Sequence, residues 1–250
     1  ALGGGGAIQA SLRGVAPVIG VNDIADFTLA TGSAQKPVLE SALASLYDAN
    51  TLFAATSVQA LDAVDELAGE QPSQYPVEGG ASYPTGRFGS QLRELAQIIK
   101  AGMGLEVACV DIGGWDHHAA IGQALPPLLS ELAQGLLAFR SDLGSRMAEV
   151  TVVTLTEFGR RAYQNASGGT DHGSAFGSIA LGGGVNGGHV YAEWPGLRDA
   201  DLFNGDLNVT TDYRTWLAEL LEKRAGNSDV ASVFPEFMPG PALGLFRPRS

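Results

Sequence analysis

The chain has 250 residues, of which 45% are hydrophobic and 17% charged, and its formal net charge is −12. This composition excludes a disordered or collagen-like chain, and the length suits one α/β domain, with or without an appendage. An acidic surface argues against a nucleic-acid-binding protein and against a cationic membrane-surface helix. The single cysteine, Cys109, excludes an internal disulfide framework. No run of about 18 apolar residues occurs, so we expect no transmembrane segment.

The N-terminal part, residues 1–102, has the pattern of a helical and loop-rich cover region. The elements expected in chain order are loops with at most one short strand over residues 1–36, helices over 37–50 and about 58–68, a connecting loop over 69–86 and an amphipathic helix over 88–102. In the last of these, Leu92, Leu95 and Ile98 recur at helical spacing, which predicts one buried face.

The C-terminal part, residues 103–250, has the pattern of an α/β core that forms one structural domain with the cover region. The expected elements are strands over 106–110 and 150–155 with a long helix over about 119–147 between them, a third apolar run over 178–181 and a helix over about 213–225. Pro126 and Pro127 indicate that the regular part of the long helix begins late. Strand, helix and strand in succession predict a mostly parallel sheet flanked by helices.

Carboxylate and imidazole side chains gather where the expected strands end. Asp111 follows the first strand, Glu157 follows the second, and His118 lies in the loop after Asp111. Asp171 and His172 lie together in the loop before the third apolar run. Ligands of open α/β sheets bind beyond the carboxyl ends of strands, so we expect these side chains to share one rim. Carboxylate oxygens neutralise a cation and imidazoles supply directional nitrogen atoms, so the pattern predicts a divalent metal site of the zinc type.

Each of these residues also has a purely structural interpretation. Asp111 could cap the helix that follows it. Glu157 could form an ion pair with Arg160 or Arg161, and the loop of Asp171 could be a plain turn. None of these single explanations accounts for the gathering of all the groups at strand ends, which favours the metal site.

Two residues inside the same motifs are candidates for substrate binding. Arg160 could clamp an anionic oxygen of a phosphate or sulfate group, or it could be a salt-bridge partner. Trp115 could form a wall of the pocket or serve only in packing. His117 is expected to be spare, because two neighbours in sequence rarely both point at one ion.

Several of these motifs occur together, and in order, in a known family. The segments Asp111-Ile-Gly-Gly-Trp-Asp-His-His118, Thr156-Glu-Phe-Gly-Arg160 and Gly168-Gly-Thr-Asp-His-Gly173 resemble the bacterial "domain of unknown function 1501" family over about residues 100–225. That family is assigned to the alkaline-phosphatase and sulfatase-like superfamily, and its members are typically longer and commonly carry a twin-arginine export signal. The resemblance therefore implies an alkaline-phosphatase-like fold and a periplasmic or secreted location.

The same resemblance implies a metal-dependent hydrolase of small phosphate or sulfate esters, or a metal-binding remnant of one. Asp111, His118 and His172 match positions of phosphatase metal ligands, whereas Glu157 stands where the phosphatases carry an Asp-His pair. The nucleophile of the superfamily belongs to an early strand, so the chain is expected to correspond to the C-terminal portion of a longer protein or to a reduced variant. The alternatives are a non-catalytic exported binding or scaffold protein that retains the fold, and an acidic surface that recruits cations loosely.

Overall fold

The computed structural model describes residues 71–249 without a gap, together with residues 2–4, 12–13, 18–21, 24, 38, 41–42, 62, 65–67 and 69–70. The chain divides into two compact units. The first consists of Ala1–Gly113 and Glu131–Gly144, and the second of Gly114–Ser130 and Ser145–Ser250. The helices expected over 37–50 and about 58–68 lie mostly outside the described residues.

The first unit contains a small parallel sheet. Its strands are β1 (Leu2–Gly4), β2 (Ile19–Val21) and β3 (Ala108–Cys109), in the order β2-β1-β3. Both neighbours pair with β1 in parallel. β3 lies inside the apolar run expected to form a strand. The region expected to be helical and loop-rich cover thus contributes two strands, one of them glycine-rich and without the apolar pattern that would have predicted it.

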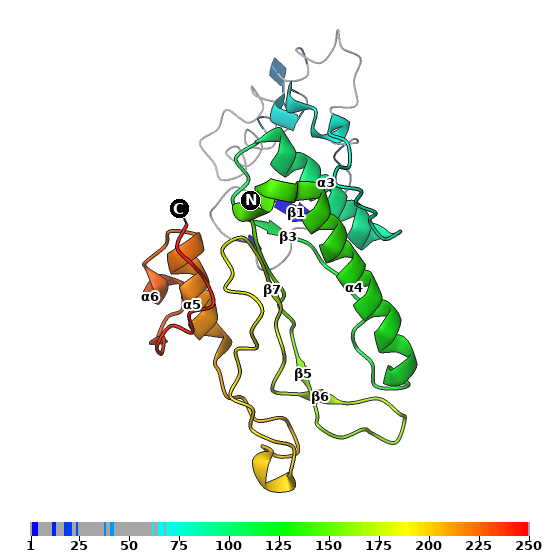
Figure 1. Ribbon diagram of the computed structural model, residues 1–250, viewed down its shortest axis with the longest axis vertical. Helices are drawn as coiled ribbons and strands as arrows, with labels where there is room; N and C mark the ends of the chain where they lie inside the picture. Colours follow the sequence, from blue (N-terminus) through cyan, green and yellow to red (C-terminus); the bar gives the residue numbers. More distant parts are fainter. Residues whose placement is uncertain are drawn as a thin grey trace. The chain divides into compact units, whose positions relative to one another are not determined.

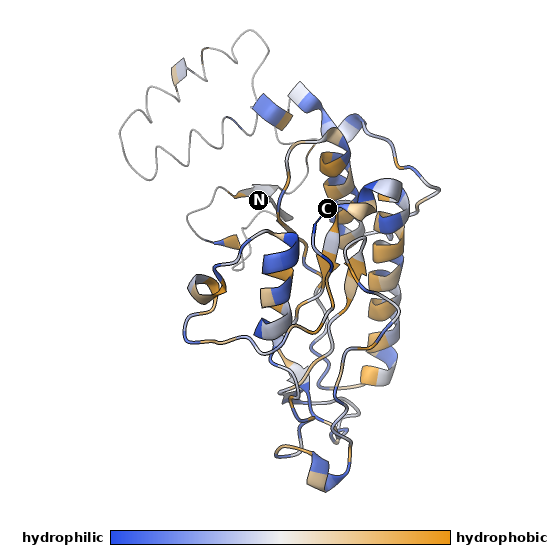
Figure 2. Cartoon of the chain, turned by 60° about the vertical axis from the view of Figure 1, so that its left-hand side comes forward, coloured by the Kyte–Doolittle hydropathy of each residue, from blue (hydrophilic) through white to orange (hydrophobic). Residues whose placement is uncertain are grey.

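Two helices pack closely in the first unit. They are α3 (Arg87–Ala101) and the C-terminal part of α4 (Ile121–Leu143), shown in Figure 1. A Cβ atom at Gly135 of α4 would lie 2.4 Å from the ring of Phe88 of α3, so only glycine allows this approach. α3 confirms the helix expected over 88–102. α4 is mainly apolar along its length (Figure 2), and Ala138, Phe139 and Leu143 are buried.

α4 begins earlier than its prolines indicated. The helix starts at Ile121, and Pro126 and Pro127 both lie inside it. The expectation of a late start was therefore wrong. Each proline removes one N–H donor but keeps a φ near −65°, which a helix also requires, so the first turns form despite both residues.

A buried ion pair joins α3 to α4 in the first unit. Lys100 donates to Asp142, and the side chains of both residues are fully buried. Asp142 also accepts hydrogen bonds from the Glu78 amide at 2.6 Å and from the Tyr83 hydroxyl at 2.8 Å. Lys100 donates in addition to the Pro76 carbonyl at 2.7 Å. Because each charge has several partners, the pair also holds the preceding loop against the two helices.

The second unit is built on short antiparallel strand pairs. β4 (Thr151–Val153) pairs with β7 (Ala180–Gly182), and β5 (Gly159–Arg160) pairs with β6 (His172–Gly173). Its core is formed by Val185, by Trp216 of α5 (Tyr213–Arg224) and by Phe246. Short helices between residues 71 and 249 are η2 (Pro72–Gln74) in the first unit and η3 (Gly144–Ala148), η4 (Asp199–Asp201) and α6 (Val230–Val233) in the chain that follows.

The expected α/β character is present as a mixture of helices and short strands, but the mostly parallel core is not. Parallel pairing is found for β1 with its two neighbours, whereas β4 pairs with β7 in the antiparallel direction. A parallel return needs a long crossover, usually a helix. Between β4 and β7 the chain forms only loops and the pair β5–β6. Without a crossover helix, β7 lies antiparallel to β4. None of the described helices has the length and apolar character needed to cross a bilayer.

Candidate functional site

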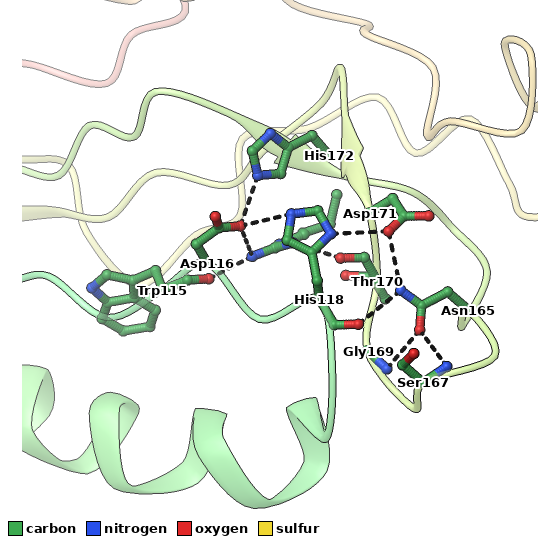
Figure 3. Close-up of polar contacts among 10 residues, drawn as sticks. Trp115, Asp116, His118, Asn165, Ser167, Gly169, Thr170, Asp171 and His172 are labelled. Carbon is green, nitrogen blue, oxygen red and sulfur yellow. Dashed lines mark hydrogen bonds and ion pairs between the residues drawn. The ribbon is translucent and has the colours of Figure 1, made fainter.

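Three side chains of the second unit converge on one point (Figure 3). The Oδ1 atom of Asp116 lies 3.0 Å from Nε2 of His118 and 2.8 Å from Nε2 of His172. One ligand atom of each residue lies within 4.8 Å of those of the other two, so the group could hold a metal ion. About half of each side chain is exposed, with values of 57% for Asp116, 49% for His118 and 47% for His172. The group is therefore open to solvent and to a substrate.

The other nitrogen of His118 faces a second carboxylate. Its Nδ1 lies 2.9 Å from Oδ1 of Asp171. Both ring nitrogens of His118 thus face carboxylate oxygens. A neutral imidazole carries a proton on only one nitrogen, so the second contact is favourable only if that nitrogen also gains a proton or binds a cation. A carboxylate, an imidazole and a cation in line form an arrangement common at protein metal sites.

Main-chain hydrogen bonds join the segment that carries His118 to the loop that carries His172. They run from the Thr170 amide to the His117 carbonyl, from Ala120 to Ser167 and from Ile121 to Gly168. The contact is close at Gly169, where a Cβ atom would lie 2.2 Å from the main-chain carbon of His118. Any other residue would force the two segments apart. The loop therefore needs glycine at this position to bring His118 and His172 together.

The side chain of Asn165 closes this loop. Its Oδ1 accepts hydrogen bonds from the amides of Ser167 and Gly169, both at 3.0 Å. Its Nδ2 donates to the His118 carbonyl at 2.9 Å and to Oδ1 of Asp171 at 3.0 Å. Asparagine favours such turns because its short amide can bond to the backbone two residues on. One amide thus links the turn, the main chain of His118 and the carboxylate behind its ring.

The strand pair β5–β6 positions His172. Arg160 and His172 lie opposite each other in this pair, next to Gly159 opposite Gly173. The ring of Phe158 stacks on the imidazole of His172 with centroids 3.9 Å apart and planes 9° from parallel. The guanidinium of Arg160 also lies over the ring of Phe158, 4.8 Å from its centroid. The stacking of Phe158 on the imidazole restricts the rotation of the His172 ring.

Arg160 forms hydrogen bonds with both segments of the site, the one that carries His118 and the one that carries His172. Its Nη1 donates to the Thr170 carbonyl and its Nη2 to the Trp115 carbonyl, each at 2.5 Å. Nη2 also lies 3.4 Å from Oδ1 of Asp116. In Figure 3 the indole of Trp115 lies beyond the Asp116 carboxylate as seen from the imidazoles. Substrate binding by Arg160 and Trp115 stays a prediction.

The carboxyl groups of Asp116 and Asp171 favour their charged forms. The hydrogen bond with His172 is the main cause that lowers the pKa of Asp116, and the nearby charges of His118 and Arg160 act in the same direction. The hydrogen bond with His118 lowers the pKa of Asp171, and the bond from Asn165 adds to this effect. Both groups are therefore ionised at neutral pH, which is the form that a metal cation requires.

A family comparison covers most of the chain, including every residue of the site. A family model described as "Protein of unknown function (DUF1501)" matches residues 27–230. The chain belongs to the DUF1501 family. No curated protein and no solved structure matches it. The match extends well to the N-terminal side of the motifs that carried the resemblance in the sequence.

In this DUF1501 protein the predicted site residues divide into two groups. His118 and His172 come together, and Asp171 contacts His118. Glu157 is exposed, stands outside the three-residue group, and has no hydrogen bond or ion pair with any residue that the structure describes. Asp111 is exposed and belongs to the first unit. The roles of Glu157 and Asp111 as metal ligands stay predictions.

Two residues at the centre of the site were not among the predicted ones. Asp116 supplies the oxygen on which both imidazoles converge, and Asn165 organises the loop. Asp116 lies two residues before His118 in the same motif, so the spacing of an acidic residue and a histidine could have identified it. A position directly after an expected strand favours Asp111 instead. Asn165 shortly before Gly168 and Gly169 is a typical turn signal, which has no specificity for a functional site.

Proposed function

We propose that this DUF1501 protein is a metal-dependent hydrolase of phosphate or sulfate esters, with one divalent ion held by Asp116, His118 and His172. The observation that supports this proposal is the convergence of two imidazole nitrogens, at 3.0 and 2.8 Å, on a single carboxylate oxygen. The resemblance of the motifs to alkaline phosphatases and sulfatases supports the class of ester and an alkaline-phosphatase-like fold. The periplasmic or secreted location is part of the same proposal.

The donor set fits a transition-metal ion. Two imidazoles and one carboxylate suit zinc and also iron(II), whereas magnesium and calcium prefer oxygen ligands alone. Bonds of 2.0–2.2 Å place two ligands of one zinc ion at most about 4.4 Å apart. The ligand atoms of the three residues lie within 4.8 Å of one another in the structure, so small side-chain rotations are enough to bring all of them to one ion. Three protein ligands are the number found at catalytic zinc sites, which keep a further position open.

The chemistry follows from the residues around this group. A divalent ion held there would polarise the ester oxygens and lower the pKa of an attacking nucleophile. Asp116 contributes the negative charge of the donor set, and about half of its side chain is exposed to an incoming ester. Arg160 uses two of its N–H groups on carbonyls, and a guanidinium has five, so others can hold an anionic ester oxygen.

Zinc binding to the purified full chain tests the metal site. We expect the variants Asp116→Asn, His118→Gln and His172→Gln to bind zinc at least about 100-fold more weakly than the wild type in a titration against a chromophoric chelator. His189→Gln is the matched control, because His189 is an exposed histidine of the same unit whose ring lies edge-on to that of Tyr191. Equal affinity of all these proteins would contradict the site. Glu157→Gln and Asp111→Asn show whether either carboxylate adds a ligand.

Hydrolysis of aryl phosphates and aryl sulfates tests the reaction. We expect turnover with zinc, iron(II), manganese or cobalt(II), and its loss on chelation and in His172→Gln. A protein that binds metal tightly but hydrolyses neither ester would instead be a non-catalytic binding or scaffold protein. Weak, non-selective uptake of cations that no single substitution alters would indicate only the acidic surface.

A further inference from the structure

We infer that Asp171 is a positioning residue which, held by Asn165, determines that His118 presents Nε2 to the metal. Asp171 is then not itself a metal ligand, although its place next to His172 in the sequence suggests that it is one. The inference rests on the proposed metal site and adds the residue that orients it. It is carried by the hydrogen bonds around Asp171 and Asn165.

The orientation of the Asn165 amide is determined by its four partners. Two main-chain N–H groups, those of Ser167 and Gly169, point at one end of the amide. That end must be the oxygen, because two donors cannot face an NH₂ group. The NH₂ end is therefore directed at the carbonyl of His118 and at the carboxylate of Asp171. Asn165 thus donates to Asp171 and holds it in place.

Asp171 in turn orients the imidazole of His118. The same oxygen, Oδ1, that accepts from Asn165 lies 2.9 Å from Nδ1 of His118. With a proton on Nδ1, the lone pair lies on Nε2, which is the nitrogen that faces Asp116. If Oδ1 turned towards a metal, it would lose both hydrogen bonds. Asp171 is also outside the group of three residues whose ligand atoms converge.

This arrangement has a measurable consequence for metal affinity. A carboxylate behind a metal-binding histidine fixes the tautomer and makes the imidazole a stronger donor, and its loss typically lowers metal affinity 10–100-fold. Asn is a suitable replacement, because its amide oxygen can still accept from Nδ1–H and from Asn165. A neutral amide is, however, a poor metal ligand. The pair Asp171→Asn and Asp171→Ala therefore separates a positioning residue from a ligand.

The experiment measures zinc affinity, the visible spectrum of the cobalt(II) form and the nitrogen NMR signals of the His118 ring. For Asp171→Ala we expect zinc binding about 10–100-fold weaker and loss of the single tautomer protonated at Nδ1. For Asp171→Asn we expect a smaller loss of affinity than for Asp171→Ala and an unchanged cobalt spectrum, because the acceptor that fixes the tautomer is kept although the carboxylate charge is lost. Glu193→Gln is the control, because Glu193 is an exposed carboxylate in the same unit. Thermal unfolding of the metal-free variants excludes general misfolding.

Two outcomes of the zinc titration would overturn the inference. If both Asp171 variants bind zinc as tightly as the wild type, Asp171 has no part in the site. If both lose affinity equally and the cobalt spectrum changes, Asp171 is a ligand. Should the wild type bind no metal, the proposed function fails, and the His118 tautomer is then measured in the metal-free protein at pH 8.5. A tautomer that Asp171→Ala does not change would refute the positioning role as well.

Discussion

Gly169 lies where the loop that carries His172 touches the main chain of His118. A Cβ atom there would lie 2.2 Å from the carbonyl carbon of His118 and 2.4 Å from the amide nitrogen of Ala119. We expect Gly169→Ala to lower the unfolding free energy by about 1–3 kcal/mol, because the backbone must shift to remove the overlap. Zinc affinity should fall with it, since the two halves of the site separate.

Thermal unfolding and zinc titration measure both effects of this substitution. Gly177→Ala is the matched control, because a Cβ atom at Gly177 would approach no other described part of the chain within 4 Å. If Gly169→Ala retained full stability and full zinc affinity, the close approach of the two segments would not be needed for the site.

Asp142 of α4 forms a buried ion pair with Lys100 of α3. Its side chain and that of Lys100 are fully buried. We expect Asp142→Asn to lower the unfolding free energy by about 3–5 kcal/mol, because it leaves a buried ammonium without its counter-charge. The double variant Lys100→Met with Asp142→Leu should be considerably more stable than the single one, since it removes both charges. Urea unfolding followed by circular dichroism compares them, and equal losses in the two variants would contradict the ion pair.

At the scale of elements, α5 holds the end of the described chain through one buried carboxylate. Glu219 accepts hydrogen bonds from the amides of Phe246 at 2.9 Å and Gly244 at 3.1 Å, and from Lys223 at 3.0 Å. In Glu219→Gln one oxygen becomes an NH₂ group that faces an N–H donor. We expect a loss of about 1–3 kcal/mol in stability and faster hydrogen exchange at residues 244–246.

Hydrogen exchange followed by mass spectrometry locates this effect. Glu222→Gln, on the same helix but exposed, is the control. Unchanged exchange at residues 244–246 in Glu219→Gln would show that the hydrogen bonds of Glu219 do not hold this segment.

At the scale of the whole molecule, two opposing effects govern stability at acid pH. The net charge of −12 makes the many carboxylates repel one another, and their protonation relieves this repulsion. Asp142 acts in the opposite direction. Burial alone would raise its pKa, but hydrogen bonds from Lys100, the Glu78 amide and Tyr83 outweigh burial, and the pKa is lowered. A lowered pKa in the folded state stabilises the protein above the unfolded value and loses this effect as pH falls.

The difference in unfolding free energy between the wild type and Asp142→Asn isolates the contribution of Asp142. We expect this difference to be largest above the ordinary aspartate pKa of about 3.9 and to shrink as the pH falls through the lower pKa of the folded state. Urea unfolding at pH 7, 5 and 3 measures it. A difference that stayed constant over this range would mean that the pKa of Asp142 is the same in the folded and the unfolded protein, which would contradict the lowered pKa.

Some features of the fold and site followed from local patterns along the chain. Helices α3 and α4 were predicted because apolar residues recur at the spacing of one helical face, and α5 lies within the helix expected over about 213–225. The strands β3 and β4 lie within continuous apolar runs that were expected to form strands. His118 and His172 were selected because they occur in glycine-rich loops next to those runs. Each of these conclusions depends on residues that are close in sequence.

The sequence alone therefore determined which segments form the main helices and which loops carry the imidazoles, since both depend on neighbouring residues. Only the tertiary structure decided that β4 pairs with β7, that Asp116 is the carboxylate shared by both imidazoles, and that Asp171 faces His118. Apart from the contact of Asp116 with His118, these contacts join residues that lie far apart in the chain. Whether such residues meet depends on the path of the intervening loops, which close contacts such as that at Gly169 make possible.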